Sequence, residues 1–518
     1  MTAAQPDRTA QPDRTAQPDS TAQPDATAQP DRTAAADRTS LADASAPPED
    51  DLIQTRHALS TPDRELSYTA TAGRMVLREQ GRENGEYTGL KPKAEMFITA
   101  YTLDGADPGT RPVTFAFNGG PGSSSVWLHL GVLGPRRVIM GDAGNLAPPP
   151  YGLGDNEQTL LAHSDLVFID PVTTGYSRVV PGGEPDEYHG FRRDLEAVGE
   201  LIRLWTTRNG RWLSPKYLAG ESYGTLRASA LAAYLQREFG FFCNGIMLIS
   251  SIIDMGTTKF TEGNDLPAFL YLPTYAALAH YHGLREGREL GEVIAEAADL
   301  AEGPYLRGLV RGARLPADER ADLVRQVAAV TGLSEDFVSR VNLRIEHKRF
   351  FRELLRARGQ VIGRLDGRFT GRDPDDGGEW PSHDPSDIAI RGPYAAALNH
   401  YVRAELGYES DLPYEVLTGK VQPWSYAEFE GRPVSVSAML SEAMRHNPHL
   451  RVYVACGYYD GATPFAAAEY AFAHVNIPDG LRSQISFEYF ESGHMMYLHE
   501  PSRARLSASL ADFVTAVS

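Results

Sequence analysis

The sequence predicts an α/β fold in which a mostly parallel sheet is covered by helices and interrupted by a mainly helical insertion. From about Leu52 onward, short apolar segments alternate with amphipathic stretches, which is the pattern that strands and helices give in such a fold. Between Ile253 and Val452 this alternation breaks down, and we place the insertion there. The strand candidates are rich in Val, Ile, Phe or Tyr, as buried strands tend to be. They are residues 96–102, 113–117, 166–169, 217–219, 245–253, 452–455 and 485–490.

The insertion has a helical periodicity of its own. Leu323, Val327 and Val330 recur at helical spacing. Gly332 ends this pattern, and Ser334 is placed to cap the helix that follows. We therefore expect the insertion to consist mainly of helices.

Residues 366–387 are rich in Asp, Gly and Pro, and their acidic side chains raise the alternative of a calcium loop. Two features argue against calcium. Gly377 occupies a position where an oxygen ligand is required, and Pro374 stiffens the start of the loop. We therefore expect a solvated surface loop.

Composition and charge exclude several classes of protein. Hydrophobic residues make up 42% of the 518 and charged residues 23%, which is ordinary for a globular chain. No apolar run approaches the roughly 18 residues that a membrane-spanning helix needs, so we expect no membrane partner. The 50 Lys and Arg against 68 Asp and Glu give a net charge of −18, which repels phosphate backbones and argues against nucleic acid as a partner.

The start of the chain differs from the rest. Residues 2–38 are near-copies of Thr-Ala-Gln-Pro-Asp-Arg, whose prolines disfavour helix and which offer no large apolar side chain to bury. The predicted division is a disordered tail at 1–50, a first part of the core at 51–255, the insertion at 256–440 and a second part of the core at 441–518. The tail lacks the features of a secretory signal, and the only cysteines are Cys243 and Cys456. A cytoplasmic location is therefore predicted, with export by another route left open.

A candidate nucleophile lies at residues 220–224. Their sequence, Gly-Glu-Ser-Tyr-Gly, fits the G-x-S-x-G pattern of a nucleophile elbow. The segment follows the strand candidate 217–219 and leads into a helical pattern at 226–234, which is the context that the elbow needs. We predict that the hydroxyl of Ser222 points above the carboxyl-terminal edge of the sheet from a strained turn that the glycines permit.

The partners that a serine nucleophile needs are found downstream. A hydroxyl requires a base that is itself oriented by a carboxylate, and in a fold with this elbow the order is Ser, then Asp or Glu, then His. Asp460 follows the strand candidate 452–455, and His494 follows the candidate 485–490. We therefore predict a catalytic triad of Ser222, Asp460 and His494.

The oxyanion that forms on the attacked carbonyl needs two backbone N–H donors. One is assigned to Tyr223, directly after the nucleophile. The other is assigned to Gly120, because the strand candidate 113–117 leads into Asn-Gly-Gly-Pro-Gly at 118–122. Paired glycines there let a backbone amide approach a ligand closely.

Taken together, the motifs resemble those of the serine carboxypeptidase family, peptidase family S10. Residues 118–125 are similar to its Asn-Gly-Gly-Pro-Gly-x-Ser-Ser block, and residues 220–224 to its Gly-Glu-Ser-Tyr-Gly block. Residues 170–177 resemble its Asp-x-Pro-x-Gly-x-Gly-Phe-Ser segment, one residue shorter, and residues 493–495 resemble its histidine block. The motifs follow the family's order, and the chain resembles a bacterial-type member.

The resemblance implies an α/β-hydrolase fold with a mostly parallel central sheet and an inserted, mainly helical cap domain. It also implies a serine-type carboxypeptidase that releases C-terminal amino acids from peptides through an acyl-enzyme. Asn118 and Glu221 are implied to bind the terminal carboxylate of the substrate. A protonated Glu221 can donate a hydrogen bond to that carboxylate, whereas an ionised one would repel it. Activity on free-acid peptides is therefore expected to favour mildly acidic pH.

Two residues depart from the family's pattern. Ser123 stands where secreted members usually have Cys, and Val132 stands where the family usually has a second acidic residue. Val132 leaves the carboxylate network short of a member, so a serine carboxypeptidase-like acyltransferase or esterase is the alternative. A non-catalytic binding protein on a hydrolase fold is an alternative of another class. The intact triad and the two intact oxyanion loops argue against it.

The predicted partner is a peptide substrate, and neither a metal nor another cofactor is expected. His446 and His449 have no matching carboxylate motif, and the glycine-rich residues 119–122 lack the spacing of a nucleotide-binding loop. The oligomeric state is open, with a homodimer among the alternatives.

Overall fold

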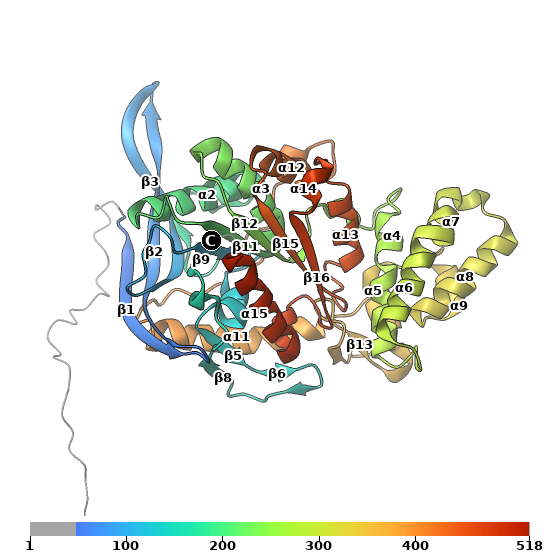
Figure 1. Ribbon diagram of the computed structural model, residues 1–518. Helices are drawn as coiled ribbons and strands as arrows, with labels where there is room; N and C mark the ends of the chain where they lie inside the picture. Colours follow the sequence, from blue (N-terminus) through green and yellow to red (C-terminus); the bar gives the residue numbers. More distant parts are fainter. Residues whose placement is uncertain (1–47, 517–518) are drawn as a thin grey trace, which may run out of the picture. The chain divides into compact units, whose positions relative to one another are not determined.

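The central sheet contains the predicted parallel strands. The computed structural model describes residues 48–516, and every strand candidate overlaps one strand of a sheet with the order β1-β2-β3-β9-β4-β11-β12-β15-β16, in which β10 (Arg178–Val179) pairs with β3 (Figure 1). From β9 to β16 neighbouring strands run parallel. These strands are β9 (Asp165–Ile169), β4 (Val113–Phe117), β11 (Lys216–Ser222), β12 (Gly245–Ser251), β15 (Arg451–Gly457) and β16 (Ile485–Phe490). Their carboxyl ends meet at one edge, where such sheets bind ligands.

Antiparallel strands extend the sheet beyond the predicted ones. β1 (Asp51–Ser60), β2 (Glu65–Glu83) and β3 (Glu86–Leu103) pair antiparallel in sequence order, and β3 also pairs antiparallel with β9. The sequence indicated only residues 96–102 of this region. In β2 the buried residues alternate with more exposed Ser and Thr. The buried residues are Leu66, Tyr68, Ala70 and Ala72. Alternating Ala and Thr gives little hydrophobic contrast, which explains why the pattern is weak in the sequence.

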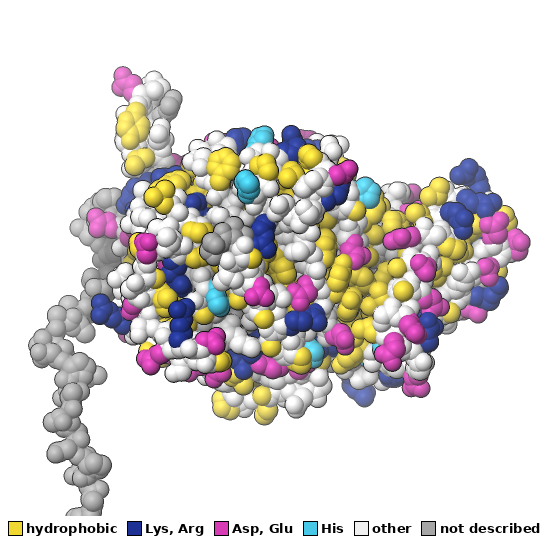
Figure 2. All heavy atoms as spheres, in the orientation of Figure 1, with side chains coloured by type: hydrophobic (Ala, Val, Ile, Leu, Met, Phe, Trp, Pro, Cys, Tyr) yellow, Lys and Arg dark blue, Asp and Glu magenta, His cyan; other side chains and the backbone are white. Residues whose placement is uncertain are grey.

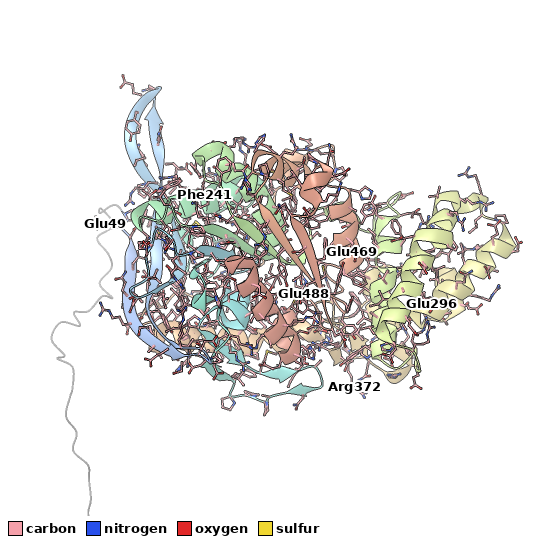
Figure 3. The ribbon with its side chains drawn as sticks, in the orientation of Figure 1. Glu49, Phe241, Glu296, Arg372, Glu469 and Glu488 are labelled. Atoms are coloured by element: carbon pink, nitrogen blue, oxygen red, sulfur yellow. The ribbon has the colours of Figure 1, made fainter. Side chains whose placement is uncertain are left out.

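Helices cover both faces of the sheet, and each face has its own hydrophobic core (Figures 1 and 3). The helices of one core are α2 (Phe191–Arg208), α3 (Tyr223–Phe239), α12 (Ser437–His446) and α13 (Phe465–Ala473); those of the other are α11 (Pro385–Ala404) and α15 (Glu500–Thr515). Successive strand side chains alternate between the cores. Ile246 and Leu248 of β12 belong to the first core, and Met247 and Ile249 to the second. All of β12 is buried, which is why residues 246–249 form an unbroken apolar run before the buried Ser250 and Ser251.

Between β12 and β15 the chain forms a helical layer with a third hydrophobic core. Its elements are α4 (Leu266–Leu270), α5 (Leu272–Tyr281), α6 (Leu290–Leu300), α7 (Leu306–Arg311), α8 (Ala317–Thr331), α9 (Glu335–Arg340), α10 (His347–Glu353) and the hairpin of β13 (Val361–Ile362) and β14 (Thr370–Gly371). As predicted, α8 ends at the left-handed Gly332, and Ser334 Oγ accepts a hydrogen bond from the Phe337 amide at 3.2 Å. Helix α11 lies within the range predicted for the insertion, but it packs on the sheet.

The surface loop predicted at 366–387 is buried at its start, which corrects that expectation. Asp366 and Arg368 are 1% and 6% exposed, and they form an ion pair with an Nη2 to Oδ2 distance of 2.7 Å. Charged groups can be buried when they are paired and hydrogen-bonded, and composition does not reveal the pairing. Residues 374–380 are exposed, as the prediction requires.

The predicted disordered tail falls mainly on residues 1–47, which lie outside the described residues. Residues 48–50 do not belong to a free tail, because the Asp50 carboxylate accepts a hydrogen bond from the Val76 amide of β2 at 2.9 Å. Cys243 and Cys456 are both buried free thiols. On the face seen in Figure 2, acidic and basic side chains are intermingled. Within residues 48–516, no helix has the length and apolar character needed to cross a membrane.

Candidate active site

The predicted elbow is formed where β11 ends at Ser222 and α3 begins at the next residue. Ser222 has φ 59° and ψ −128°, a conformation that a residue with a side chain rarely adopts. Both glycines of the motif are required sterically. A Cβ on Gly220 would lie 2.1 Å from the carbonyl oxygen of Gly224, and one on Gly224 would lie 2.8 Å from that of Phe117. The turn leaves Ser222 partly exposed at the carboxyl end of β11.

Asp460 and His494 form a buried hydrogen-bonded pair after β15 and β16. His494 Nδ1 lies 2.8 Å from Asp460 Oδ2. Asp460 also accepts hydrogen bonds from the amides of Ala462 and Thr463, at 2.7 and 2.9 Å, and from the Thr463 hydroxyl at 2.7 Å. Burial lowers the pKa of His494, but the charge and hydrogen bond of Asp460 outweigh it, so the pKa is raised above its usual value. With Nδ1–H donating to Asp460, the lone pair of Nε2 can take a proton.

The parallel strands bring the histidine loop to the elbow. β11, β12, β15 and β16 are consecutive neighbours, and Ser222 is in register with Ser251 of β12. The hydroxyl of Ser250, also in β12, donates to the carbonyl oxygen of His494 at 2.5 Å. Because β12 borders β11, this bond anchors His494 beside the elbow. The structure thus places Ser222, Asp460 and His494 at the carboxyl edge of the sheet, at the end of β11 and in the loops after β15 and β16.

The loops that carry the two predicted oxyanion donors are in direct contact. A Cβ on Gly119 would lie 2.4 Å from the amide nitrogen of Tyr223 and 2.9 Å from that of Gly224. Gly120 has φ 100°, a region open to glycine. Tyr223 is the first residue of α3, where an amide has no partner within the helix. The predicted donors, Gly120 and Tyr223, therefore lie on adjacent backbone segments next to Ser222.

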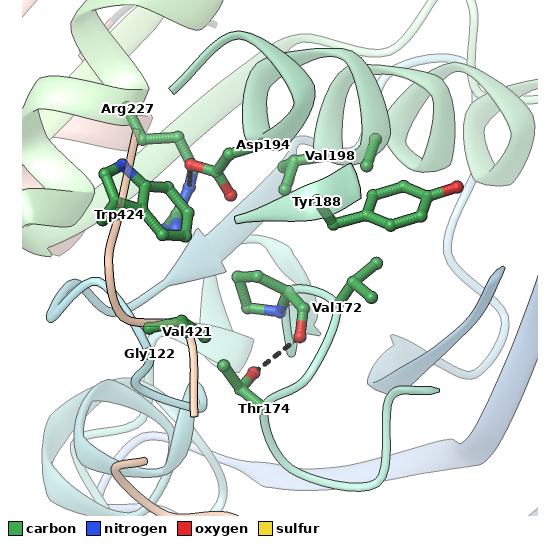
Figure 4. A pocket seen from close by; sticks show the side chains of 11 residues that line it. Gly122, Val172, Thr174, Tyr188, Asp194, Val198, Arg227, Val421 and Trp424 are labelled. Atoms are coloured by element: carbon green, nitrogen blue, oxygen red, sulfur yellow. Dashed lines mark hydrogen bonds and ion pairs between the residues drawn. The ribbon is translucent and has the colours of Figure 1, made fainter. Parts of the chain in front are cut away.

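A buried ion pair, not predicted from the sequence, ties these two loops together. Arg227 of α3 and Asp194 of α2 are 1% and 4% exposed, and Arg227 Nε lies 2.7 Å from Asp194 Oδ2 (Figure 4). Arg227 Nη1 donates to the carbonyl oxygen of Asn118 at 2.7 Å, and the Tyr223 hydroxyl donates to Asp194 Oδ2 at 3.3 Å. The one signal in the sequence is that Arg227, one helical turn after Tyr223, is the first charged residue of α3 and has no other charged residue after it until Arg237.

The motif at 170–177 supports the oxyanion loop. Asp170 Oδ1 accepts hydrogen bonds from the amide and the hydroxyl of Ser125, at 2.8 and 2.7 Å, and Oδ2 accepts one from the Tyr414 hydroxyl at 2.8 Å. Ser123, which stands where the resemblance expects Cys, accepts a hydrogen bond from the Trp127 indole at 2.8 Å. The loop is thus fixed by hydrogen bonds rather than by a disulfide at this position.

Glu221, beside the nucleophile, lies in a buried network of neutral donors. Asn118 Nδ2 donates to Glu221 Oε1 at 3.0 Å, and the Tyr497 hydroxyl donates to Oε2 at 2.7 Å. Burial raises the pKa of Glu221 to about 7, although His494 and the two hydrogen bonds lower it. Glu221 therefore retains its proton at mildly acidic pH, which its predicted role with Asn118 requires. Tyr497 was not predicted, because no motif distinguishes it.

The position where the family usually has a second acidic residue is apolar. Val132 is 1% exposed within the turn η1 (His129–Leu133) and belongs to the same hydrophobic core as Tyr394 and Tyr497. Burial raises the pKa of both tyrosines, and Glu221 is an electrostatic neighbour of each. The phenol of Tyr497 therefore adjoins the Glu221 carboxyl on this side.

A segment of the insertion holds both loops of the Asp460 and His494 pair. The carbonyl oxygen of Leu365 accepts a hydrogen bond from the His494 amide at 2.7 Å, and that of Arg364 accepts one from the Gly461 amide at 3.0 Å. Asp366 Oδ2 accepts one from the Gly493 amide at 3.2 Å. Sequence patterns could not show this, because most of the contacts are made by backbone groups.

Comparisons with known proteins agree with the motifs. The family model described as serine carboxypeptidase matches residues 80–267, a range that contains the oxyanion loop and the elbow. Serine carboxypeptidase-like 37 of Arabidopsis thaliana is 30% identical over 156 residues, and serine carboxypeptidase-like 36 of the same plant is 31% identical over 147 residues. Each match covers 27% of this chain and only 28% of the relative's length. Since both relatives are plant proteins, they do not support the bacterial-type prediction.

A solved structure extends the comparison to most of the chain. Kex1(delta)p, a prohormone-processing carboxypeptidase from Saccharomyces cerevisiae, has a TM-score of 0.50 and 16% identity, over 88% of this chain and 93% of that chain. At this identity the likeness shows the fold alone. The α/β-hydrolase fold predicted from the sequence is confirmed.

Proposed function

We propose that the protein is a serine-type carboxypeptidase that releases the C-terminal amino acid of a peptide. The observation that carries the proposal is the Glu221 carboxyl group, which adjoins the nucleophile, is 3% exposed and accepts hydrogen bonds from the neutral side chains of Asn118 and Tyr497. A buried acid that retains its proton can donate a hydrogen bond to a terminal carboxylate. The match of residues 80–267 to the serine carboxypeptidase model supports the same assignment.

In the proposed reaction Ser222 is the nucleophile. His494 Nε2 takes the hydroxyl proton as the serine oxygen attacks the carbonyl carbon of the last peptide bond, while Asp460 stabilises the imidazolium. The amides of Gly120 and Tyr223 donate to the oxyanion, each worth about 3 kcal/mol in the transition state. His494 then gives its proton to the leaving amine, and the C–N bond breaks. Water, deprotonated by His494, attacks the remaining ester and regenerates the serine.

Recognition of the terminal carboxylate depends on the proton of Glu221. With its pKa raised to about 7, Glu221 is mostly neutral in mild acid and mostly ionised in mild base. The neutral form donates a hydrogen bond to a carboxylate, whereas the ionised form repels it. The KM of a peptide with a free C-terminus should therefore rise with pH above about 7, by about tenfold per pH unit. A C-terminal amide carries no such charge and should not show this rise.

The experiment compares a blocked dipeptide with its C-terminal amide across this pH range. We expect the free acid to be the better substrate in mild acid and to lose its advantage in base. The variant Glu221→Gln, which stays neutral, should remove the pH-dependence of KM. Parallel profiles for acid and amide would overturn the role of Glu221, and hydrolysis that survives Ser222→Ala would overturn the nucleophile.

An esterase or acyltransferase is the second candidate, and Val132 is the observation that favours it. Such an enzyme would form the same acyl-Ser222 but would not need the terminal carboxylate. A panel of peptide acid, peptide amide and simple ester separates the two, because only a carboxypeptidase loses activity when the carboxylate is masked. A folded protein that does not react with a serine-directed fluorophosphonate would instead favour a non-catalytic binding protein. The cytoplasmic location and the bacterial type remain predictions from the sequence.

A further inference from the structure

Tyr497 holds the Glu221 carboxyl from the histidine side of the site. It lies in the turn η9 (Met496–Leu498) and donates from its hydroxyl to Glu221 Oε2 at 2.7 Å. The other oxygen, Oε1, accepts a hydrogen bond from Asn118 at 3.0 Å. Glu221 and Tyr497 are 3% and 4% exposed, so water competes little for this bond. One amide and one phenol therefore fix the orientation of the carboxyl group.

Gly131 provides the space for the Tyr497 ring. A Cβ on Gly131 would lie 2.3 Å from Cε2 and 2.5 Å from Cδ2 of Tyr497, and 3.0 Å from the Tyr394 hydroxyl. Any side chain at this position would displace the ring. Gly131 directly precedes Val132, so the backbone turn that lacks the second acidic residue is also the turn that admits a phenol against Glu221.

Tyr497 also borders open space. With Gly131, Tyr394, Met140 and Asp142, it lines a cavity of about 330 Å³, a volume within the range of small-molecule sites. Neither Glu221 nor Asn118 lines this cavity, so Tyr497 is the residue that the cavity and the hydrogen-bonded network share.

We propose that Tyr497 is a positioning residue for substrate recognition, whose hydroxyl orients Glu221 toward the terminal carboxylate of a peptide. This inference rests on the proposed carboxypeptidase function. A protonated carboxyl group has one O–H donor and can still accept hydrogen bonds. Since Tyr497 and Asn118 both donate to Glu221, its own proton is the donor left for a third partner, and the terminal carboxylate is that partner.

The variant Tyr497→Phe tests the proposal because it keeps the ring and removes only the hydroxyl. That hydroxyl lowers the pKa of Glu221, so its loss should raise this pKa. For a blocked dipeptide, the rise of KM with pH should then move to higher pH by about one unit. Because Glu221 is held less firmly, KM in mild acid should increase about fivefold while kcat changes by less than about twofold.

Tyr453→Phe is the matched control. The Tyr453 hydroxyl donates to Glu488 Oε2 at 2.7 Å, the same distance, but this pair lies on β15 and β16, where Glu488 is labelled in Figure 3. Its pH profile should equal that of the wild type. Gly131→Ala is the second test variant, because the added methyl group displaces the Tyr497 ring and should also move the profile to higher pH. A simple ester without a carboxylate reports the intact triad in every variant.

The outcomes separate this inference from the proposed function. If the wild type distinguishes acid from amide but Tyr497→Phe leaves the pH profile in place or moves it down, the inference is wrong and the proposed function stands. If the wild type treats acid and amide alike, the proposed function itself is wrong. If Tyr497→Phe does not fold, Gly131→Ala decides by the same criterion.

Discussion

Two buried carboxyl groups interact electrostatically with His494, and they differ in the groups that donate to them. Asp460, 0% exposed, accepts hydrogen bonds from two backbone amides and from the Thr463 hydroxyl, and it pairs with the imidazole. Glu221, 3% exposed, accepts one hydrogen bond from Asn118 and one from Tyr497. Both are equally hidden from water, so burial alone does not distinguish them.

The difference shows how one site can hold a charged and a neutral carboxyl group. Several donors, among them fixed backbone amides, suit an ionised carboxylate, and the Asp460 carboxylate raises the pKa of His494 against the effect of burial. At Glu221 the two neutral donors offset only part of the effect of burial on the pKa, so the pKa is raised to about 7. In the proposed reaction, the first group orients the base and the second holds a proton for the substrate. Changes at each group should therefore have different signatures.

The largest effect is expected from Asp460→Asn, which replaces the carboxylate that pairs with His494 by an uncharged amide. An amide at this position can donate to Nδ1 of His494 and so stabilise the wrong tautomer, which removes the base. In serine hydrolases with this geometry the loss is about 10⁴-fold in kcat. Rates on peptide acid, amide and ester should fall alike, because the triad serves all three. A loss of less than about tenfold on all substrates would contradict the role of Asp460.

Glu221→Gln tests, through the free energy of unfolding, whether the folded protein keeps the Glu221 carboxyl neutral. The pKa of Glu221 is raised from 4.5 to about 7 in the folded state. Between these values the unfolded chain releases the proton that the folded chain retains, so stability falls as pH rises through this window. Each pKa unit is worth about 1.4 kcal/mol, so the cost above pH 7 is about 3 kcal/mol. Relative to the wild type, the variant should gain about this much unfolding free energy between a pH below 4.5 and a pH above 7.

Denaturant unfolding at the two pH values measures this gain. Glu488→Gln is the control, because Glu488 also accepts a tyrosine hydrogen bond at 2.7 Å but its side chain is 25% exposed. A difference between Glu221→Gln and the wild type that does not depend on pH would show that burial does not raise the pKa of Glu221.

The parts of the site that could be predicted from the sequence are those set by local geometry. The elbow at 220–224 requires two glycines around a strained serine, and the loop at 118–122 requires glycines against the elbow, so both leave a mark in a few consecutive residues. Asp460 and His494 follow strands whose apolar sequences are clear. The fold class follows from the same runs, since parallel strands are buried on both faces.

The parts that could not be predicted depend on contacts between distant segments. The hydroxyl of Tyr497 meets Glu221 across 276 residues of sequence, and Arg227 meets the Asn118 carbonyl across 109. Neither contact has a local pattern. The start of the segment at 366–387 was expected at the surface, because its composition resembles that of a loop and its burial depends on the pairing of Asp366 with Arg368.

The smallest effect is expected from Thr463→Val, which weakens the donors to Asp460 without removing its charge. The Thr463 hydroxyl donates to Asp460 Oδ2 at 2.7 Å, while the two backbone amides that donate to Asp460 Oδ1 remain in the variant. Losing one such hydrogen bond should lower kcat about fivefold for peptide acid and amide alike, and Thr463→Ser, which keeps the hydroxyl, should restore it. The pH at which KM rises should not move, because that pH reports Glu221. If Thr463→Val changes the preference for acid over amide, then the two carboxyl groups are coupled through His494, and the division of roles between them is wrong.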